Sequence, residues 1–328
     1  NDTKIFYFHT KGVSNNYDIY NDKTISQEKI ENIKLWRECL EYFLKEAKLA
    51  LNSFKDWEMI LVDDGSTDQS WSIISRHALK DKKVRGIRFT RNFGHQHAVL
   101  AGLRATQFSY IGIIDADLQD PPSLLPKMTS CITDGVEIVY GKRSNREGET
   151  FFKKFSARFF YRLFQRLVPF QIPLDTGDFR VISRRACDSV TSLNEQEPFL
   201  RGLFALTGLK AIPFEYSRHQ RFAGSSNYSL SKMFRFAVNA IFAFSEVPYK
   251  LFMKMGLWSF FVALLFGVSA IIYAIVGESN SGWLSIFALV LFFGSLNAVF
   301  TALVGTYVIK SLNIVRSRPT YFISEIKN

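Results

Sequence analysis

Three aspartates follow an apolar run in the stretch YIGIIDADLQDPP, residues 110–122. Asp115, Asp117 and Asp120 come directly after residues typical of a buried strand, and two prolines end the stretch. Asp115 and Asp117 alternate at the period of a strand, so both carboxylates would gain from a shared cation. Paired carboxylates near a phosphate are common ligands of Mg²⁺ or Mn²⁺. The alternative is a solvated turn, but the spacing favours a site for a metal and a diphosphate.

A second acidic cluster, DDGSTD, follows the apolar run WEMILV and contains Asp63, Asp64 and Asp68. One interpretation is a tight turn in which Asp and Ser side chains cap the next helix. The other is a ligand site, because ligands of parallel α/β sheets bind outside the carboxyl ends of the strands. The residues leave both interpretations open, and we expect the two acidic clusters to meet in one crevice.

Apolar runs alternate with helical patterns through this part of the chain. We expect strands within 57–68, 84–92, 110–122 and 137–143, and helices within 69–79 and 94–106. Such alternation predicts an α/β domain with a mostly parallel, Rossmann-like sheet and helices on both faces.

The charge balance suggests an anionic partner. Lys and Arg number 41 against 30 Asp and Glu, which gives a net charge of +11. Nucleic acid, an anionic membrane surface and a phosphorylated substrate all fit this charge. Nucleic acid is disfavoured, because the basic residues lie beside apolar segments and interleave with no recognition motif. The three cysteines have no metal-ligand spacing and indicate neither a zinc site nor a disulfide framework.

Two long stretches near the C-terminus, 256–276 and 282–309, contain no charged residue. Each is long enough to cross roughly 30 Å of hydrocarbon, whereas a buried helical hairpin would seldom run so far without a charge. Basic residues flank the pair on one side: Lys250, Lys254, Lys310, Arg316 and Arg318. The positive-inside rule then places both flanks, and the large N-terminal part, in the cytoplasm.

Two further segments have an interfacial character. In 151–168 basic residues recur every four positions opposite an aromatic face, which predicts a helix lying on a membrane surface or packing on the domain's own core. Residues 229–255 lead toward the first apolar stretch. We therefore divide the chain into an N-terminal strand and helix (1–54), a catalytic domain (55–228), juxtamembrane helices (229–255), two transmembrane helices (256–310) and a cytoplasmic tail (311–328).

The motifs taken together resemble family 2 glycosyltransferases of the GT-A fold, and more closely the polyisoprenyl-phosphate glycosyltransferases of bacterial membranes. The resemblance covers roughly residues 55–315. It is carried by ILVDDGSTDQS, RNFGHQHAVLAGL, DADLQDPP, YGKRSNREGE, DTGDFRVISRRA, FLRGLFALTGL and RFAGSSNYSLSKM, followed by the two apolar stretches. Each motif alone is weak, but the set in this order is specific.

The resemblance implies that DDGS, with Asp63, Asp64 and Ser66, contacts the base and ribose of a UDP-sugar donor. Family members usually open with a strand ending in V-P-x-Y/F-N-E, which lines the same pocket, and this chain has no such motif. KIFYFHT, residues 4–10, could replace that strand, and the amphipathic stretch after it could be the first helix. Donor binding is the function that this departure affects.

The resemblance also implies a metal and diphosphate site in DADLQ. Asp117 would be the direct ligand of Mg²⁺ or Mn²⁺, with Asp115 as a second ligand beside the sugar or ribose and Gln119 in support. A divalent cation there would neutralise the departing diphosphate as a Lewis acid. His95 and His97 follow RNFG with no third ligand in sequence, so we expect them to orient the turn.

The remaining implied roles concern the acceptor and the phosphates. Asp178 and Arg180 of GDFR would close the active site near the acceptor. Arg143 and Arg221 would bind phosphate oxygens, for which the guanidinium fork is suited. Asn227 stands where relatives often have Lys.

The resulting hypothesis is a metal-dependent, inverting transferase of the bacterial plasma membrane. It would move a hexose, glucose from UDP-glucose, onto undecaprenyl or another polyprenyl phosphate at the cytoplasmic face. A lipid phosphate is already an anionic nucleophile, so a strong general base is less necessary. Membrane lipids are expected partners, and a homo-oligomer is compatible with the sequence. The alternatives are another donor sugar, such as mannose, N-acetylglucosamine or aminoarabinose, and an inactive membrane scaffold.

Overall fold

The computed structural model describes residues 4–10, 27–143, 176–193, 195–217, 247–276 and 282–328. The chain divides into two compact units, of which the first comprises Asn1–Gln165, Phe170–Leu230 and Pro319–Asn328 and the second Arg166–Pro169 and Ser231–Arg318. Outside the described residues lie the predicted interfacial helix 151–168, the juxtamembrane residues 229–246, Arg221 and Asn227.

The described part of the first unit contains an eight-stranded sheet in the order β7-β5-β6-β4-β1-β2-β3-β8. The strands are β1 (Lys4–Thr10), β2 (Trp57–Asp63), β3 (Val84–Phe89), β4 (Tyr110–Asp115), β5 (Ile138–Arg143), β6 (Thr176–Ser183), β7 (Ala211–Tyr216) and β8 (Ile323–Lys327). The pairs β1–β2, β1–β4, β2–β3 and β5–β7 are parallel, and β3–β8, β4–β6 and β5–β6 are antiparallel. The sheet of the described residues is thus mixed, with four parallel and three antiparallel pairs, and the predicted α/β fold is confirmed.

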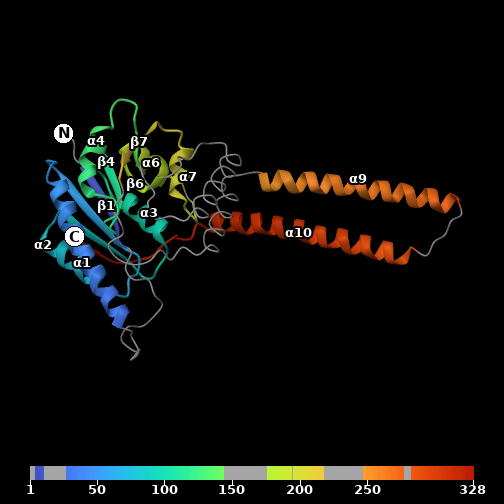
Figure 1. The fold of residues 1–328 in the computed structure, drawn as a ribbon, viewed down its shortest axis with the longest axis horizontal. Helices are drawn as coiled ribbons and strands as arrows, with labels where there is room; N and C mark the ends of the chain where they lie inside the picture. The colour runs from blue at the N-terminus through green and yellow to red at the C-terminus, as the bar shows by residue number, and fades with distance from the viewer. Residues whose placement is uncertain (1–3, 11–26, 144–175, 194, 218–246, 277–281) are drawn as a thin grey trace. The chain divides into compact units, whose positions relative to one another are not determined.

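Helices cover both faces of this sheet (Figure 1). They are α1 (Gln27–Leu51), α2 (Ser70–Lys80), α3 (His95–Ala105), the 3₁₀ turn η1 (Pro122–Leu124), α4 (Leu125–Ser130), α6 (Arg184–Thr191) and α7 (Leu200–Leu206). α1 packs with α2, η1 and α4, whereas α3 packs with α6, and α6 with α7. The chain runs from β1 through β2 to β3 and then crosses back past β1 to β4, and right-handed crossovers in opposite directions place their helices on opposite faces.

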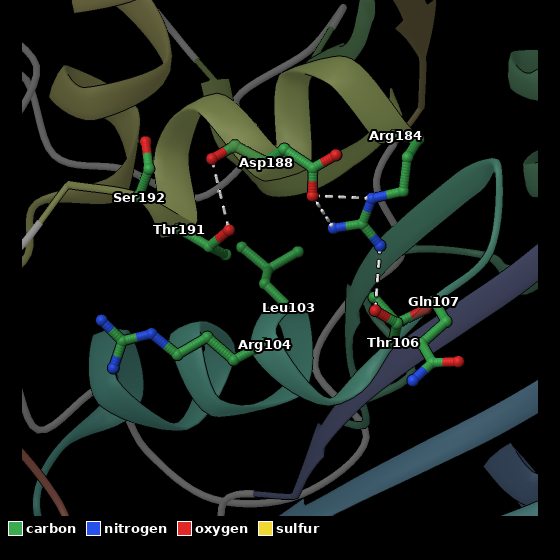
Figure 2. A pocket seen from close by; sticks show the side chains of 8 residues that line it. All are labelled: Leu103, Arg104, Thr106, Gln107, Arg184, Asp188, Thr191 and Ser192. Atoms are coloured by element: carbon green, nitrogen blue, oxygen red, sulfur yellow. Dashed lines mark hydrogen bonds and ion pairs between the residues drawn. The ribbon is translucent and has the colours of Figure 1, made fainter.

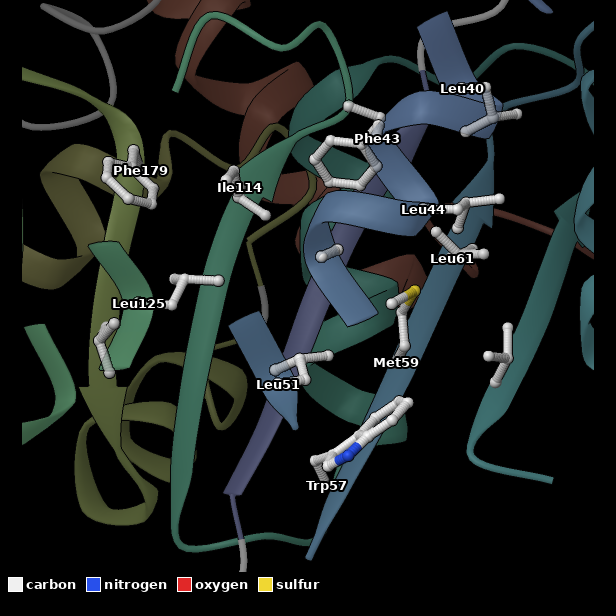
Figure 3. Close-up of a cluster of buried hydrophobic side chains, with 14 of the residues drawn as sticks. Leu40, Phe43, Leu44, Leu51, Trp57, Met59, Leu61, Ile114, Leu125 and Phe179 are labelled. Atoms are coloured by element: carbon white, nitrogen blue, oxygen red, sulfur yellow. The ribbon is translucent and has the colours of Figure 1, made fainter. Parts of the chain in front are cut away.

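The core forms where α1 packs on the sheet. Apolar side chains recur on α1 at helical spacing, and they are buried: Leu40, Phe43, Leu44, Ala47 and Leu51. Figure 3 shows several of them over Met59 and Leu61 of β2 and Ile114 of β4. Burying one such side chain contributes about 1.5–3 kcal/mol. This packing fixes the amphipathic stretch as the first helix of the domain.

β1 takes the central position that the family's first strand would have. It pairs in parallel with β2 on one side and β4 on the other. Thr10 lies opposite Asp63 of β2, and His9 lies opposite Asp115 of β4. The end of β1 is therefore the place where the two acidic clusters approach each other.

The C-terminal residues add an edge strand that the sequence did not suggest. β8 pairs antiparallel with β3, with Ile326 opposite Ile87. Trp71 Nε1 on α2 donates a hydrogen bond to Glu325 Oε2 at 2.8 Å. Part of the predicted tail thus belongs to the sheet.

The second unit contains two long helices, α9 (Val247–Val276) and α10 (Trp283–Arg316). Windows in both, Phe252–Ser269 and Phe292–Arg316, have a mean hydropathy of 1.6 and bury none of their residues. The helices lie side by side (Figure 1), and the Phe252 and Phe300 ring centroids are 5.6 Å apart. Both helices are long and apolar enough to cross a membrane.

Gly65, in the turn after β2, is expected to tolerate no side chain. Its φ is +68°, and a Cβ would lie 2.3 Å from the carbonyl carbon of Arg91. Gly65→Ala should lower the free energy of unfolding by about 2–3 kcal/mol, because left-handed strain and a backbone clash add. Denaturant unfolding of the detergent-solubilised chain, followed by tryptophan fluorescence, measures the change.

Gly208 supplies the matched control. Its φ is +66°, but a Cβ there would meet nothing within 4 Å. Gly208→Ala should therefore cost only the strain, about 1 kcal/mol. Equal losses in the two variants would show that the contact between Gly65 and the Arg91 backbone is unimportant.

Candidate active site

The acidic motif leaves the carboxyl end of β4 in a strained turn. Asp115 ends the strand, and Leu118 has a φ of 59°, which is unusual for a residue with a branched side chain. The backbone N–H of Gln119 donates to Asp117 Oδ1 at 3.1 Å. Strain of this kind costs on the order of 1 kcal/mol and often occurs at ligand sites. The turn holds the Asp115 and Asp117 carboxylates near the end of the strand.

Asp120, the third aspartate, has a structural role. It is only 2% exposed, and it accepts a hydrogen bond from the Tyr216 hydroxyl at the end of β7. Burial and the Asp120 charge raise the pKa of Tyr216, so the phenol stays a donor. Asp120 therefore connects the acidic turn to β7, the strand at one edge of the sheet.

His95 joins two carboxylates. Its Nε2 donates to Asp178 Oδ2 at 2.8 Å, and its Nδ1 lies 3.7 Å from Asp115 Oδ1. Burial lowers the pKa of His95, but the Asp115 and Asp178 charges outweigh it and raise the pKa to about 9. The imidazole is thus a cation at neutral pH, so His95 does more than orient the turn.

Asp178 lies at the centre of a hydrogen-bonded cluster. Besides His95, the Arg201 Nε donates to its Oδ1 at 2.9 Å and the Gln96 Nε2 donates to its Oδ2 at 3.2 Å. Burial raises the pKa of Asp178, but Arg201 and His95 outweigh it and hold the pKa well below its usual range. Asp178 is therefore ionised at neutral pH and a poor proton acceptor.

The Arg180 guanidinium makes its hydrogen bonds to backbone carbonyl groups of the protein. The side chain is buried and donates to the carbonyl oxygens of Gly177 and Asp178, each at 3.2 Å. Its guanidinium carbon lies 4.6 Å from the centroid of the Phe204 ring. These contacts orient β6 and α7, so Arg180 supports the site from within the fold.

Arg143 is the last residue of β5, which pairs with β6, the strand that carries Arg180. Its Nε is buried with no hydrogen-bond partner among the residues that the structure describes. A Cβ on Gly177 would lie 2.8 Å from an Arg143 terminal nitrogen, so glycine leaves room for the guanidinium. The Arg143 side chain also acts on Tyr216, lowering the phenol pKa against burial.

The DDGS turn is built around two carboxylates with different partners. Asp64 accepts the backbone N–H groups of Phe93 at 2.7 Å and of Gly94 at 2.9 Å. Burial raises the pKa of Asp64, and these two bonds act against it. Asp63 is fully buried and accepts the N–H of Ser66 at 3.2 Å. The turn is therefore fastened to residues 90–94, which follow β3.

Two neighbouring side chains make contacts to the backbone. Asp68 Oδ1 accepts the N–H of Ser70, the first residue of α2, at 2.9 Å, but the N-cap residue Gln69 makes no side-chain capping bond. His97 lies between carbonyl oxygens, 2.8 Å from that of Phe93 and 3.1 Å from that of Gln196. His97 thus orients the turn before α3.

A cation would suit the acidic pair. Burial and the nearby charges of Asp117, Asp178 and Asp120 together raise the pKa of Asp115 to about 6, although the His95 charge acts against them. A divalent cation would relieve this repulsion, and carboxylate oxygens are the ligands that Mg²⁺ and Mn²⁺ accept. Asp115 and Asp117 therefore fit such an ion.

A separate hollow of about 510 Å³ lies at the opposite end of α3 from His95 (Figure 2). Arg184, which lines it, is paired with Asp188 at 2.6 Å and donates to the Thr106 carbonyl oxygen at 2.9 Å. Its chemistry is that of a surface ion pair, and none of the residues with predicted roles lies there.

The sequence comparisons agree with this geometry. Residues 34–191 match the family described as Glycosyl transferase family 2. The chain is 38% identical to the uncharacterized glycosyltransferase YkcC of Bacillus subtilis, over 83% of this chain and 84% of that one. The chain belongs to glycosyltransferase family 2. It is also 32% identical to the bactoprenol glucosyl transferase of Shigella phage SfX, over 82% of this chain and 89% of that one.

Solved structures resemble the chain more distantly. One is glucosyl-3-phosphoglycerate synthase from Mycobacterium tuberculosis in complex with Mn²⁺, UDP and glucosyl-3-phosphoglycerate. It is 17% identical, covers 73% of this chain and 77% of its own, and has a TM-score of 0.41. Membership of the family thus rests on the sequence relatives.

Proposed function

We propose that this family 2 glycosyltransferase moves glucose from UDP-glucose onto a polyprenyl phosphate at a membrane surface. The observation that carries the proposal is the meeting of two acidic motifs: Asp115 at the end of β4 and the DDGS turn at the end of β2 flank the end of β1. The names of relatives, bactoprenol glucosyl transferases among them, support the sugar and the acceptor.

Asp117 and Asp115 would hold Mg²⁺ or Mn²⁺. When bound, the ion would offset the negative charge that develops on the leaving diphosphate. The strained turn at Leu118 presents the Asp117 carboxylate, and the N–H of Gln119 keeps it oriented. His95 would hold Asp115 from the side of the protein.

The donor would bind beside the DDGS turn. Asp64 accepts hydrogen bonds from the Phe93 and Gly94 amides, and Asp63 accepts one from the Ser66 amide. The DDGS turn and residues 90–94 would thus form one wall of the donor pocket. His9 and Thr10, at the end of β1, would supply the remaining edge of the pocket in place of the usual motif. We expect weaker nucleotide binding than in relatives that carry that motif.

The acceptor phosphate would attack without a strong base. Asp178 is ionised and has a depressed pKa, and its carboxylate accepts hydrogen bonds from His95, Gln96 and Arg201. These properties suit a positioning role better than proton abstraction. A phosphate oxygen is already anionic, so this arrangement is sufficient. Arg143, at the end of β5, and Arg221 would neutralise phosphate oxygens.

The apolar helices α9 and α10 would anchor the enzyme in the bacterial plasma membrane. Their basic flanks favour a cytoplasmic catalytic domain, on the side where nucleotide sugars are made. The two helices would keep the enzyme in the membrane in which its lipid acceptor resides. The 151–168 segment would add contact with lipid headgroups.

A donor panel tests the proposal. Purified full-length protein is incubated with undecaprenyl phosphate, Mn²⁺ and one labelled nucleotide sugar at a time, and label is counted in the organic phase. UDP-glucose should give the fastest transfer. Faster transfer from another nucleotide sugar would replace glucose with that sugar, and no transfer from any donor would favour a scaffold.

A further inference from the structure

The turn after β3, residues 90–94, is held from two sides. From the DDGS side, Asp64 binds the Phe93 and Gly94 amides, and Gly65 packs against the Arg91 backbone. From the other side it meets the segment just before β8. The Thr90 N–H donates to the Phe322 carbonyl oxygen at 3.0 Å.

Aromatic rings add to the contact between the 90–94 turn and the segment before β8. The Phe322 ring centroid lies 6.1 Å from that of Phe93, and the Tyr321 ring stacks on Phe89 at 4.9 Å and 18°. Phe93 also carries the Arg91 guanidinium over its ring, at 4.1 Å from the centroid. Phe93 thus has the Arg91 cation and two rings, those of Phe89 and Phe322, as neighbours, while its own N–H is bound to Asp64.

We propose that Tyr321 and Phe322 are positioning residues for the nucleotide donor. They hold the 90–94 turn where its amides meet Asp64, so the segment just before β8 sets the shape of this side of the proposed donor pocket. The inference rests on the proposed donor site beside DDGS. The Phe322 ring is 53% exposed, so its removal leaves the hydrophobic core intact and its effect should be confined to the turn.

Three variants of the full chain in detergent micelles separate positioning from general stability. Phe322→Ala removes the ring, and Phe322→Tyr retains it. Ile326→Ala shortens another exposed side chain on the same C-terminal segment, one that pairs with Ile87 away from the turn. The three proteins are compared with wild type in two measurements.

The first measurement is hydrogen exchange of the peptide covering residues 90–97, without nucleotide. Asp64 protects two amides in this peptide, so Phe322→Ala should accelerate its exchange about three- to tenfold. Phe322→Tyr and Ile326→Ala should exchange at the wild-type rate. A wild-type rate in Phe322→Ala, or equal acceleration in Ile326→Ala, overturns the inference.

The second measurement is calorimetric titration of UDP with Mn²⁺. Phe322→Ala should bind UDP about three- to tenfold more weakly than wild type, and Phe322→Tyr should restore the affinity. The KM for the lipid acceptor should not change. Unchanged UDP affinity in Phe322→Ala contradicts the positioning role. Failure of the wild-type protein itself to bind UDP contradicts the proposed function instead, since the exchange result is obtained without nucleotide.

Discussion

Asp117→Asn should lower sugar transfer by more than about a hundredfold. An amide keeps the size of the side chain but removes the negative charge that would hold a divalent cation against the leaving diphosphate. Loss of even an outer-shell partner of a metal site typically costs 10- to 100-fold, so loss of a direct ligand should cost at least as much. Transfer of labelled sugar to the organic phase, measured over a range of Mn²⁺ concentrations, gives the effect.

Asp134→Asn is the control for this change. Asp134 is an exposed carboxylate in the turn before β5, and its loss alters net charge equally. Its transfer rate should equal that of wild type. Full activity of Asp117→Asn in the presence of a chelator would remove Asp117 from the metal site.

Arg201→Met should destabilise the domain by about 2 kcal/mol and slow transfer about tenfold. The change leaves Asp178, whose side chain is 8% exposed, without its closest guanidinium. Breaking a buried pair usually costs 3–5 kcal/mol, and the 28% exposure of Arg201 together with the remaining His95 partner reduces that figure. Denaturant unfolding in micelles measures the stability.

The stability lost in Arg201→Met should depend on pH, because it comes from the charged form of Asp178. Because the folded pKa of Asp178 is depressed, its contribution to stability is present above the unfolded pKa of about 3.9 and is lost as pH falls through the folded value. The gap between wild type and Arg201→Met should therefore be constant near pH 6 and shrink below about pH 4. Arg104→Met, at an exposed position on α3, should cost less than about 0.5 kcal/mol at any pH. An equal loss in Arg104→Met would remove the special role of the pair.

The alternating part of the fold could be read from the sequence because its signals are local. Strands β2 to β5 are short apolar runs ended by turn residues, and α2 and α3 keep a helical period. The insertion of β6 between β4 and β5 could not be read, because a hydrophobic pattern does not specify which strand lies next to which. β8 was missed because ISEIK is short and its two apolar residues are three positions apart, so it lacks the alternating pattern of a strand.

The positions of the acidic residues in the fold could be predicted where residue type and strand position were enough. Asp115 ends β4 and Asp117 follows it, and their place at the carboxyl end of a buried strand needed no long-range information. The cluster around Asp178 was only partly anticipated, because His95 and Arg201 reach it from distant points of the chain. Arg201 left one signal: it is the single charge in the apolar run FLRGLFAL, which implies a buried partner. The tie between Asp120 and Tyr216 left none.

The most direct test of the account is single-turnover transfer by the wild-type protein. Purified full-length enzyme is mixed with labelled UDP-glucose, undecaprenyl phosphate and Mn²⁺, and the organic phase is analysed for a glucosyl phospholipid. Labelled lipid should form with the wild-type protein, chelation should stop its formation, and Asp117→Asn should not form it. Release of free glucose with no labelled lipid, or lipid formation that persists in Asp117→Asn, would contradict it.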